Sequence, residues 1–338
     1  MSKLCIKCGY FGHTNRVCKG PVTSFGLVIF ADNTINLKTG RLYPFVKTEC
    51  KYHEELHPVD YKKNVGENDS GDKNHMSGNE IMFLLVERKD TVGFLSLVQG
   101  SYPDMEPFRS RKIVKYINEL TCEERLKFKD WSFENLWKIA GSEKRDYGKA
   151  EVRFKMLDIT TWMDKSPCFY QEADYLMPKG RLKYGETLQQ CALREFSEET
   201  GYKQRDVELL NFAPFEENFI GTDGKSYRNV FFVAKLRNNA DIAVKLGDDP
   251  NQSKEVRNIG WFNISECCYL IRDYHQEKKK ILKHVHDVVV NRNVANVVNG
   301  KSFIHNNLRS GNVYYHNSRF NPYTQTIQND NTCNVMRC

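Results

Sequence analysis

The residues best suited to chemistry are three acidic side chains, Glu195, Glu198 and Glu199, within one predicted helix. They lie at positions i, i+3 and i+4, which brings their carboxylates to within roughly 5–6 Å on one helix face. Like charges at this spacing repel each other unless a cation neutralises them. Oxygen ligands of this kind suit Mg²⁺ or Mn²⁺, which also bind substrate phosphates. The spacing therefore predicts a divalent-cation site, and the competing interpretation is an acidic helix face that only contacts water.

The helix that carries these glutamates has clear limits in the sequence. Residues 187–190 can form a capping box at its start, and Gly201 can take up the left-handed conformation that ends it. Before the helix, Lys179, Gly180 and Arg181 bring backbone amides and two cations close to the acidic face. Such groups can bind an anionic part of a substrate. The segment therefore combines a place for a cation with a place for a phosphate.

A second set of suitable residues lies at the N-terminus. Four metal-ligand types follow the spacing C-x2-C-x4-H-x4-C, namely Cys5, Cys8, His13 and Cys18. Three thiolates and one imidazole form a closed tetrahedral site for Zn²⁺, and a loop this short depends on the metal to fold. The segment resembles the zinc knuckle, whose aromatic residues stack on unpaired bases, so Tyr10 and Phe11 are candidates for contact with RNA. A purely structural or protein-binding knuckle is the alternative.

Composition sets wide limits on the kind of protein. The chain has 338 residues, 40% hydrophobic and 28% charged, which suits one sizeable core with an appended module or two small domains. The sequence has no run of 18 apolar residues and no secretory signal, so we expect a cytoplasmic protein. Most of the 11 cysteines are scattered and are expected to be reduced thiols. A net charge of +7 permits a polyanionic partner without requiring one.

Five segments follow one another along the chain. We expect the knuckle at 1–20, the first part of the main domain at 21–100, a helical insertion at 101–150, the second part at 151–290 and an Asn-rich, poorly ordered tail at 291–338. A Gly- and Asn-rich mobile loop is expected at 47–80. Strands are expected near residues 23–33, 81–89, 152–156, 209–219, 229–236 and 259–263, and a C-terminal helix over 264–290.

The stretch GRLKYGETLQQCALREFSEETGY, residues 180–202, resembles the signature of the Nudix hydrolases at every fixed position. The resemblance implies an α/β (α+β) fold, a sandwich of helices, mixed sheet and helices in which the signature forms a loop, a helix and a loop. It also implies that Glu195, Glu198 and Glu199 bind Mg²⁺ or Mn²⁺ while water attacks the phosphorus of an organic diphosphate. Arg194 would pair with one of these glutamates and hold its rotamer.

Two further segments resemble the Nudix enzymes that remove the cap of messenger RNA. The first is ADYLMPKGRLKYGE, residues 173–186, in which Tyr175 stands where those enzymes commonly have Trp. The second is SKEVRNIGWFN, residues 253–263. In that group the glutamate that matches Glu255 serves as general base or as an added metal ligand, and Glu216 and Glu217 are weaker candidates for this role.

The order of the knuckle, strands, insertion and split domain over residues 1–290 resembles the decapping Nudix proteins of large cytoplasmic DNA viruses. The resemblance implies capped RNA as the partner, hydrolysis of the triphosphate bridge to m7GDP and 5′-monophosphate RNA, and location in the host cytoplasm or a viral factory. The segment VQGSYP, residues 98–103, departs from the more basic segment of those proteins, so RNA contacts there are in doubt.

Several alternatives stay open. The enzyme could instead hydrolyse diphosphoinositol polyphosphates or nucleoside diphosphate derivatives, or the chain could be a non-catalytic RNA-binding protein. In the insertion, basic residues beside Tyr116 either follow an RNA backbone or only contact water, namely Arg109, Arg111, Lys112 and Lys115. The candidates for stacking on the cap base are Phe25, Tyr170, Tyr175 and Phe215. A looser group of metal-ligand types, Cys50, His53 and His57, is interpreted as coincidence.

Overall fold

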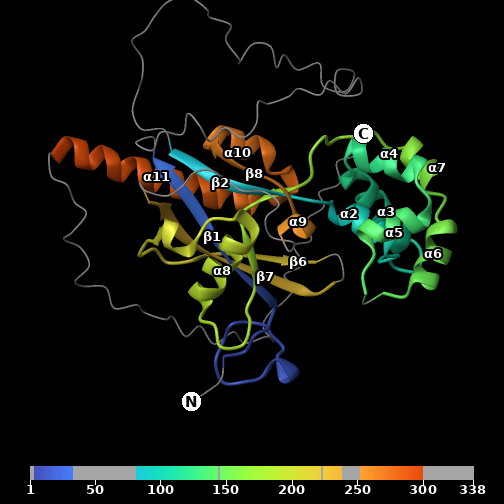
Figure 1. The fold of residues 1–338 in the computed structure, drawn as a ribbon, viewed down its shortest axis with the longest axis horizontal. Coiled ribbons are helices and arrows are strands. Elements are labelled where there is room, and N and C mark those ends of the chain that lie inside the picture. The colour runs from blue at the N-terminus through green and yellow to red at the C-terminus, as the bar shows by residue number, and fades with distance from the viewer. Residues whose placement is uncertain (1–3, 33–80, 144, 222–223, 238–251, 300–338) are drawn as a thin grey trace, which may run out of the picture. The chain divides into compact units, whose positions relative to one another are not determined.

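The computed structural model describes residues 4–32, 81–143, 145–221, 224–237 and 252–299 (Figure 1). The expected mobile loop at 47–80, the group of Cys50, His53 and His57, and the tail beyond Asn299 lie outside the described residues. No described helix combines the length and the apolar character needed to cross a bilayer.

An eight-stranded mixed sheet forms the centre of the main domain. Its long strands are β1 (Val22–Asp32), β2 (Ile81–Arg88), β7 (Ser226–Leu236) and β8 (Val256–Asn263). Its short strands are β3 (Tyr175–Leu176), β4 (Lys179–Arg181), β5 (Val207–Leu209) and β6 (Phe215–Ile220). The order β3-β2-β1-β7-β5 forms the main path, with β8 on β2, β4 on β1 and β6 on β7. Only the pair β1 and β7 is parallel among the described strands, and the other pairs are antiparallel.

Helices cover both faces of this sheet. Successive side chains of a strand point to opposite faces, so Phe25, Leu27 and Ile29 of β1 pack towards helix α8 (Leu188–Thr200). The alternate residues Val28 and Phe30 pack against α10 (Ile264–Leu270) and α11 (Gln276–Asn299). In Figure 1, α10 and α11 lie on one side of the sheet and α8 on the other. The predicted helix–sheet–helix sandwich with a mixed sheet is therefore confirmed.

The helical insertion has a core of its own and is wider than the predicted range 101–150. It contains α2 (Val92–Val98), α3 (Phe108–Glu119), α4 (Cys122–Asp130), α5 (Phe133–Ala140), α6 (Tyr147–Lys155) and α7 (Ile159–Asp164). It begins four residues after β2, because Thr91 caps α2 by accepting a hydrogen bond from the Phe94 amide. A disulfide joins Cys122 to Cys168 at its edge, whereas the other described cysteines are free.

The prediction of a strand near residues 152–156 is wrong, because this segment belongs to α6. Asp146 caps the helix by accepting a hydrogen bond from the Lys149 amide. Ala150 and Phe154, four residues apart, then face the core of the insertion. The short sequence EVRFK alternates in polarity as a strand would, which is why its pattern was ambiguous.

The other expected strands are present, but one of them is divided into two. The segment expected over 209–219 contributes to two separate strands, β5 and β6. The helix expected over 264–290 is also divided, into α10, the short 3-10 helix Asp273–His275 and α11. Helix α11 continues beyond Val290 to Asn299, into the range expected to be a poorly ordered tail.

The division between α10 and α11 places Arg272 in the interior. Its guanidinium donates hydrogen bonds to the carbonyl oxygens of Glu119 (2.8 Å) and Glu172 (2.9 Å), and lies 3.9 Å from the ring centroid of Tyr170. Its Nε lies 3.7 Å from Oδ1 of Asp174, which is also buried. One cation thus joins the insertion, the segment before β3 and the C-terminal helices. A continuous helix would carry Arg272 away from these partners.

Candidate functional site

The acidic helix α8 is held at both ends as its sequence predicts. Thr187 and Gln190 exchange the two hydrogen bonds of a capping box, at 3.2 and 2.8 Å. Gly201 ends the helix with φ of 74°. The opposite face of α8 buries Cys191, Ala192 and Phe196 in the sheet core. The glutamates consequently face strand β4 and the turn that follows it.

Arg194 lies at the centre of the acidic residues. Its Nη1 donates to Glu195 Oε1 at 2.6 Å and to Glu198 Oε2 at 2.8 Å. Its Nη2 donates to Glu186 Oε2 at 3.1 Å and to the carbonyl oxygen of Arg181 at 2.9 Å. The hydrogen bond from Arg194 lowers the pKa of Glu186. Burial opposes the charge of Arg194, but the bonds to Glu186 and Glu195 raise its pKa. The predicted pairing of Arg194 with the glutamates is thus present, and it fixes their side chains.

The backbone of β4 lies directly against the glutamates. A β-carbon added at Gly180 would lie 2.0 Å from Cδ of Glu195, so only glycine allows this approach. The amide of Lys179 donates to Glu199 Oε2 at 3.2 Å. The structure therefore brings Lys179, Gly180 and Arg181 to the acidic face, and their part in binding substrate stays a prediction.

The raised pKa values of the α8 carboxylates are consistent with a site for a divalent cation. Burial, with repulsion from Glu195 and Glu255 and partial relief from Lys179, raises the pKa of Glu199 to about 8. Burial also raises the pKa of Glu195. A divalent cation would reverse both shifts by stabilising the charged forms. Glu195 and Glu198 bind Arg194, whereas Glu199 binds the Lys179 amide, and in the described part of the chain the three carboxylates do not form a group as compact as the cysteine cluster.

Glu255 lies at the end of the short helix α9 (Gln252–Glu255), with an exposed side chain. The side-chain Nε2 of Gln252 donates to the carbonyl oxygen of Glu199 at 3.2 Å, which joins α9 to the end of α8. The competitor Glu217 is buried and already bonded to Lys278 Nζ and Asn229 Nδ2, both at 2.7 Å. A free carboxylate beside α8 is better placed to accept a proton, so the geometry favours Glu255 over Glu217.

The four predicted zinc ligands are gathered at one point. The Sγ atoms of Cys5, Cys8 and Cys18 and a ring nitrogen of His13 lie within 4.8 Å of one another. Cys8 Sγ and His13 Nε2 are 3.3 Å apart. Burial raises the pKa of the Cys8 thiol to about 12, and a bound Zn²⁺ would stabilise its thiolate. The donor set and its burial fit a structural zinc site.

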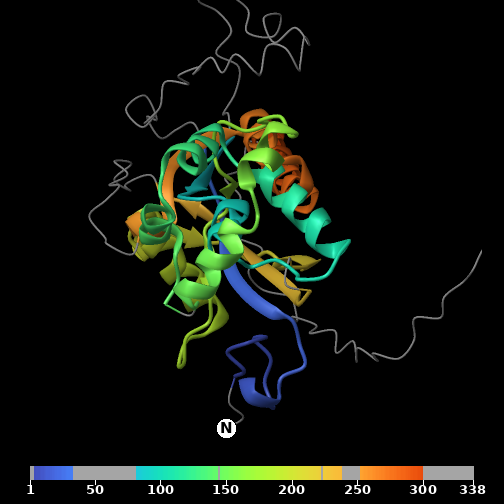
Figure 2. The ribbon, with the colours of Figure 1, turned by 90° about the vertical axis from the view of Figure 1, so that its right-hand side faces the viewer.

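The knuckle, residues 4–20, packs on the sheet where β1 begins (Figure 2). A β-carbon added at Gly9 would lie 2.5 Å from Cζ of Phe25, and the φ of Gly9 is 74°. Buried Arg228 of β7 donates to the carbonyl oxygen of Cys8 at 2.7 Å. Its guanidinium also lies 4.5 Å from the ring centroid of Tyr10. No sequence pattern indicates this role for Arg228, which lies 220 residues from Cys8.

The aromatic candidates for base contact are placed unequally. Phe25 and Tyr175 are 1% and 5% exposed, so they belong to the core and cannot stack on a base. Tyr170 is covered by Arg272 on one face, and Phe215 packs beside His284. In the knuckle, Tyr10 and Phe11 are both exposed, with Arg228 over the Tyr10 ring. Base stacking by these two residues stays a prediction.

Of the basic residues of α3, Arg111 and Lys115 are exposed and Arg109 and Lys112 are half-buried, while Ile113, Tyr116 and Ile117 face the core. Tyr116 is 1% exposed, so it packs inside the insertion and cannot contact RNA beside these cations. Lys115 lies 3.8 Å from Glu119, a partner that partly neutralises it. A path for an RNA backbone along α3 remains a prediction.

Comparisons with known proteins agree with this geometry. A model of the NUDIX domain matches residues 163–285. The "Putative mRNA-decapping protein" of Acanthamoeba polyphaga mimivirus is 28% identical in an alignment 360 positions long, which covers 88% of this chain and 97% of that protein. The mRNA-decapping protein g5R of African swine fever virus is 24% identical in an alignment 210 positions long, which covers 55% of this chain and 79% of that protein. A solved Caenorhabditis elegans Ap4A hydrolase complex has a TM-score of 0.36 and 13% identity, over 80% of this chain and 98% of that chain.

The NUDIX match begins within α7, the last helix of the insertion, whereas the sheet that carries the site also needs β1 and β2 from before the insertion. The segment 180–202 lies within the matched domain, and the viral relatives agree with this match. Residues 163–285 therefore form a NUDIX domain, whose sheet the strands β1 and β2 complete.

Proposed function

We propose that the protein is a metal-dependent decapping hydrolase, which cleaves the triphosphate bridge of capped RNA and releases m7GDP and 5′-monophosphate RNA. The observation that carries the proposal is the extent of the similarity to a protein named for mRNA decapping, 88% of this chain, well beyond the NUDIX domain. Such an enzyme would act where capped messenger RNA is found, in the host cytoplasm or a viral factory.

The side chains of the site would have different roles in hydrolysis. Glu195, Glu198 and Glu199 would hold Mg²⁺ or Mn²⁺, which neutralises phosphate charge and lowers the pKa of water when bound. Arg194 keeps Glu195 and Glu198 in place through its two Nη1 hydrogen bonds. Glu255 would accept the proton of the attacking water, since its carboxylate is exposed beside the end of α8.

Product analysis on capped RNA tests the proposal. We expect RNA labelled in the cap to release labelled m7GDP when Mg²⁺ or Mn²⁺ is present, and the reaction to fall to background when the cation is chelated, because unshielded phosphates repel the nucleophile. A free cap dinucleotide and a diphosphoinositol polyphosphate are supplied side by side at the same concentration. Preference for either small substrate over capped RNA would replace decapping by a small-molecule activity.

The zinc assignment has its own test. We expect Cys8→Ser to bring the zinc content down to background, because it removes one of four ligands. Retention of capped RNA on a filter, without added Mg²⁺ or Mn²⁺, should weaken roughly tenfold if the knuckle stacks on bases. Cys268→Ser, which changes a free cysteine of α10 outside the cluster, serves as the control. Unchanged zinc content in Cys8→Ser would show that the cluster does not hold the metal.

A further inference from the structure

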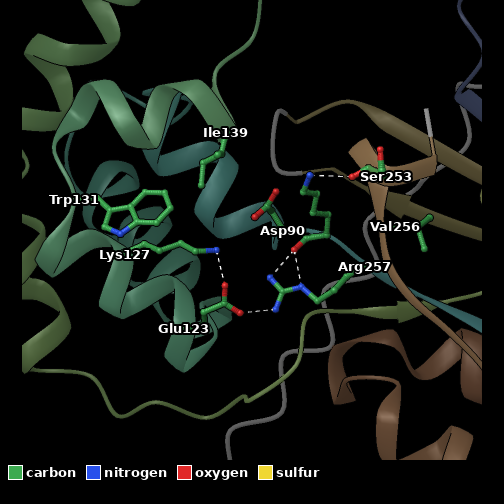
Figure 3. Close-up of a pocket in the computed structure, with 9 residues that line it drawn as sticks. Asp90, Glu123, Lys127, Trp131, Ile139, Ser253, Val256 and Arg257 are labelled. Carbon is green, nitrogen blue, oxygen red and sulfur yellow. Dashed lines mark hydrogen bonds and ion pairs between the residues drawn. The ribbon is translucent and has the colours of Figure 1, made fainter. Parts of the chain in front are cut away.

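A pocket of about 560 Å³ lies between the helical insertion and the main domain. Asp90, Glu123, Lys127 and Trp131 line it from the end of β2 and from the insertion, and Ser253 and Arg257 from α9 and β8. Figure 3 shows these side chains around one opening. A volume of this size accommodates a nucleobase, since ligand pockets range from about 300 to 1,000 Å³.

The charged side chains on the floor of the pocket are tied to one another. Glu123 binds Lys127 Nζ and Arg257 Nη1, each at 2.7 Å. Arg257 also donates to the carbonyl oxygen of Lys89 at 2.8 Å. Lys89 Nζ in turn donates to the carbonyl oxygen of Ser253 at 2.8 Å. This chain of contacts runs from the insertion to α9, so it fixes the pocket wall in one arrangement (Figure 3).

Asp90 is the exception on this wall. It is only 8% exposed, and its carboxylate points into the pocket without a hydrogen bond or ion pair to any residue described here. A buried carboxylate without hydrogen-bond donors loses its hydration, and the charges of Lys127, Arg257 and Lys89 offset only part of that loss. Burial accordingly raises the pKa of Asp90. A ligand that offers N–H donors to Asp90 would supply what the protein does not.

An exposed aromatic ring completes the pocket. Trp131 follows the last turn of α4 and is 41% exposed, although Trp is usually well covered. Its neighbour in the lining, Ile139, is 40% exposed. The two side chains form an apolar wall beside the unpaired acid. A planar, partly polar ligand fits this combination better than a phosphate does.

We propose that this pocket binds the methylated guanine base of the cap, with Trp131 stacked on the purine and Asp90 accepting hydrogen bonds from its N1–H and N2–H groups. The inference rests on the decapping function and assigns the base-recognition site for it. Guanine presents two neighbouring donors on its Watson–Crick edge, which match the two oxygens of one carboxylate. Adenine places an acceptor there and would be repelled.

Methylation at N7 strengthens this recognition. It gives the purine a positive charge, which favours stacking on the face of an indole and contact with a carboxylate. The pocket also keeps a surplus of cations, Lys89, Lys127 and Arg257 against Asp90 and Glu123, so the attached phosphates are not repelled.

The pocket adjoins the acidic helix through α9. Gln252 at the start of α9 donates to the carbonyl oxygen of Glu199, and the next residue, Ser253, lines the pocket. Glu255 ends the same helix, and its carbonyl oxygen accepts a hydrogen bond from the Lys89 amide at 2.9 Å. A base bound beside Trp131 would thus lead its phosphate chain along α9 towards the glutamates of α8.

Binding of m7GDP, GDP and ADP to the full-length chain tests the assignment by calorimetry. We expect the wild type to prefer m7GDP, and Trp131→Leu and Asp90→Asn each to weaken m7GDP binding at least tenfold. Trp131→Phe should retain more affinity than Trp131→Leu, because it keeps an aromatic face. Matched controls in the insertion but outside the pocket are Glu134→Gln, an exposed acid paired with Lys138, and Tyr147→Leu, whose ring is 39% exposed. Neither control should change the affinity.

Two results would overturn the inference: no preference of the wild type for m7GDP, or unchanged affinity in both pocket variants. Cleavage of capped RNA by the same wild-type protein would then leave the proposed function standing. Conversely, loss of m7GDP binding in the variants together with no cleavage of capped RNA by the wild type would support the base pocket and refute the decapping activity. The unfolding midpoint of each variant confirms that it is folded, and Asp90→Asn is nearly isosteric.

Discussion

The Glu199→Gln variant is expected to hydrolyse capped RNA about a thousandfold more slowly than the wild type, with its fold intact. Glu199 accepts a hydrogen bond from the Lys179 amide at the centre of the acidic face. Glutamine keeps an oxygen for that bond but carries no charge for a divalent cation, and such a ligand contributes several kcal/mol to catalysis. Release of labelled m7GDP under saturating Mg²⁺ measures the effect.

The control for this variant is Glu208→Gln on β5. Glu208 is exposed and lies 3.4 Å from Arg237, away from the acidic face of α8. We expect this change to leave the rate unaltered. The unfolding midpoint separates loss of a metal ligand from loss of the fold. Burial raises the pKa of Glu199 to about 8, so the side chain is largely uncharged at neutral pH without a cation, and glutamine should not lower the midpoint. A wild-type rate in Glu199→Gln would show that Glu199 is not a metal ligand.

Asp174→Asn is expected to lower the free energy of unfolding by about 3 kcal/mol, because it leaves a buried guanidinium without its anion. Asp174 Oδ1 accepts a hydrogen bond from the Tyr274 hydroxyl at 2.6 Å and lies 3.5 Å from His275 Nε2. Arg272, with its Nε at 3.7 Å, is 4% exposed, so bulk solvent does not reach it to replace this contact. Denaturant unfolding of the two proteins at neutral pH measures the difference.

The loss should also depend on pH. Burial opposes ionisation, yet the contacts with His275, Arg272 and Tyr274 hold the pKa of Asp174 well below its usual range. A lowered pKa in the folded state means that the stabilisation is complete above the unfolded pKa of about 3.9 and is lost as the pH falls towards the folded pKa. The difference between wild type and Asp174→Asn should therefore be constant from neutral pH to about pH 5 and shrink below about pH 4.

The exposed acid Asp273 provides the comparison for Asp174. Its side chain is 92% exposed and pairs with Lys279 at 2.7 Å. Asp273→Asn should change the unfolding free energy by less than about 1 kcal/mol, because a surface ion pair contributes little. If both variants were equally mild, the buried network around Arg272 would not be a source of stability.

Local signals in the sequence were enough to predict α8 and its surroundings. The capping box, the stop at Gly201 and the spacing of the glutamates all lie within residues 180–202. The strands β1, β2, β7 and β8 were predictable because both of their faces are buried, which makes them long and apolar. The four zinc ligands were predictable for a similar reason, since their spacing alone brings them together.

Contacts between distant parts of the chain could not be predicted in this way. The break before α11 depends on Arg272 reaching Asp174, and nothing within residues 264–290 signals that partner. The exposed Trp131 and the buried Asp90 share a pocket only because the insertion folds back on α9 and β8. A single sequence shows which residues are apolar or charged, but not which of them meet across the fold.

The hydrogen bond from Arg228 to the carbonyl oxygen of Cys8 attaches the N-terminal knuckle to the sheet of the main domain. Transplanting a knuckle from another protein onto this hydrolase would therefore require more than matching its four ligands. The new knuckle would have to place a carbonyl oxygen beside Arg228 and a glycine beside the ring of Phe25. Without that carbonyl, the buried guanidinium of Arg228 would lose its hydrogen-bond acceptor. Shuffling of such modules between relatives is thus constrained by the strand on which they rest.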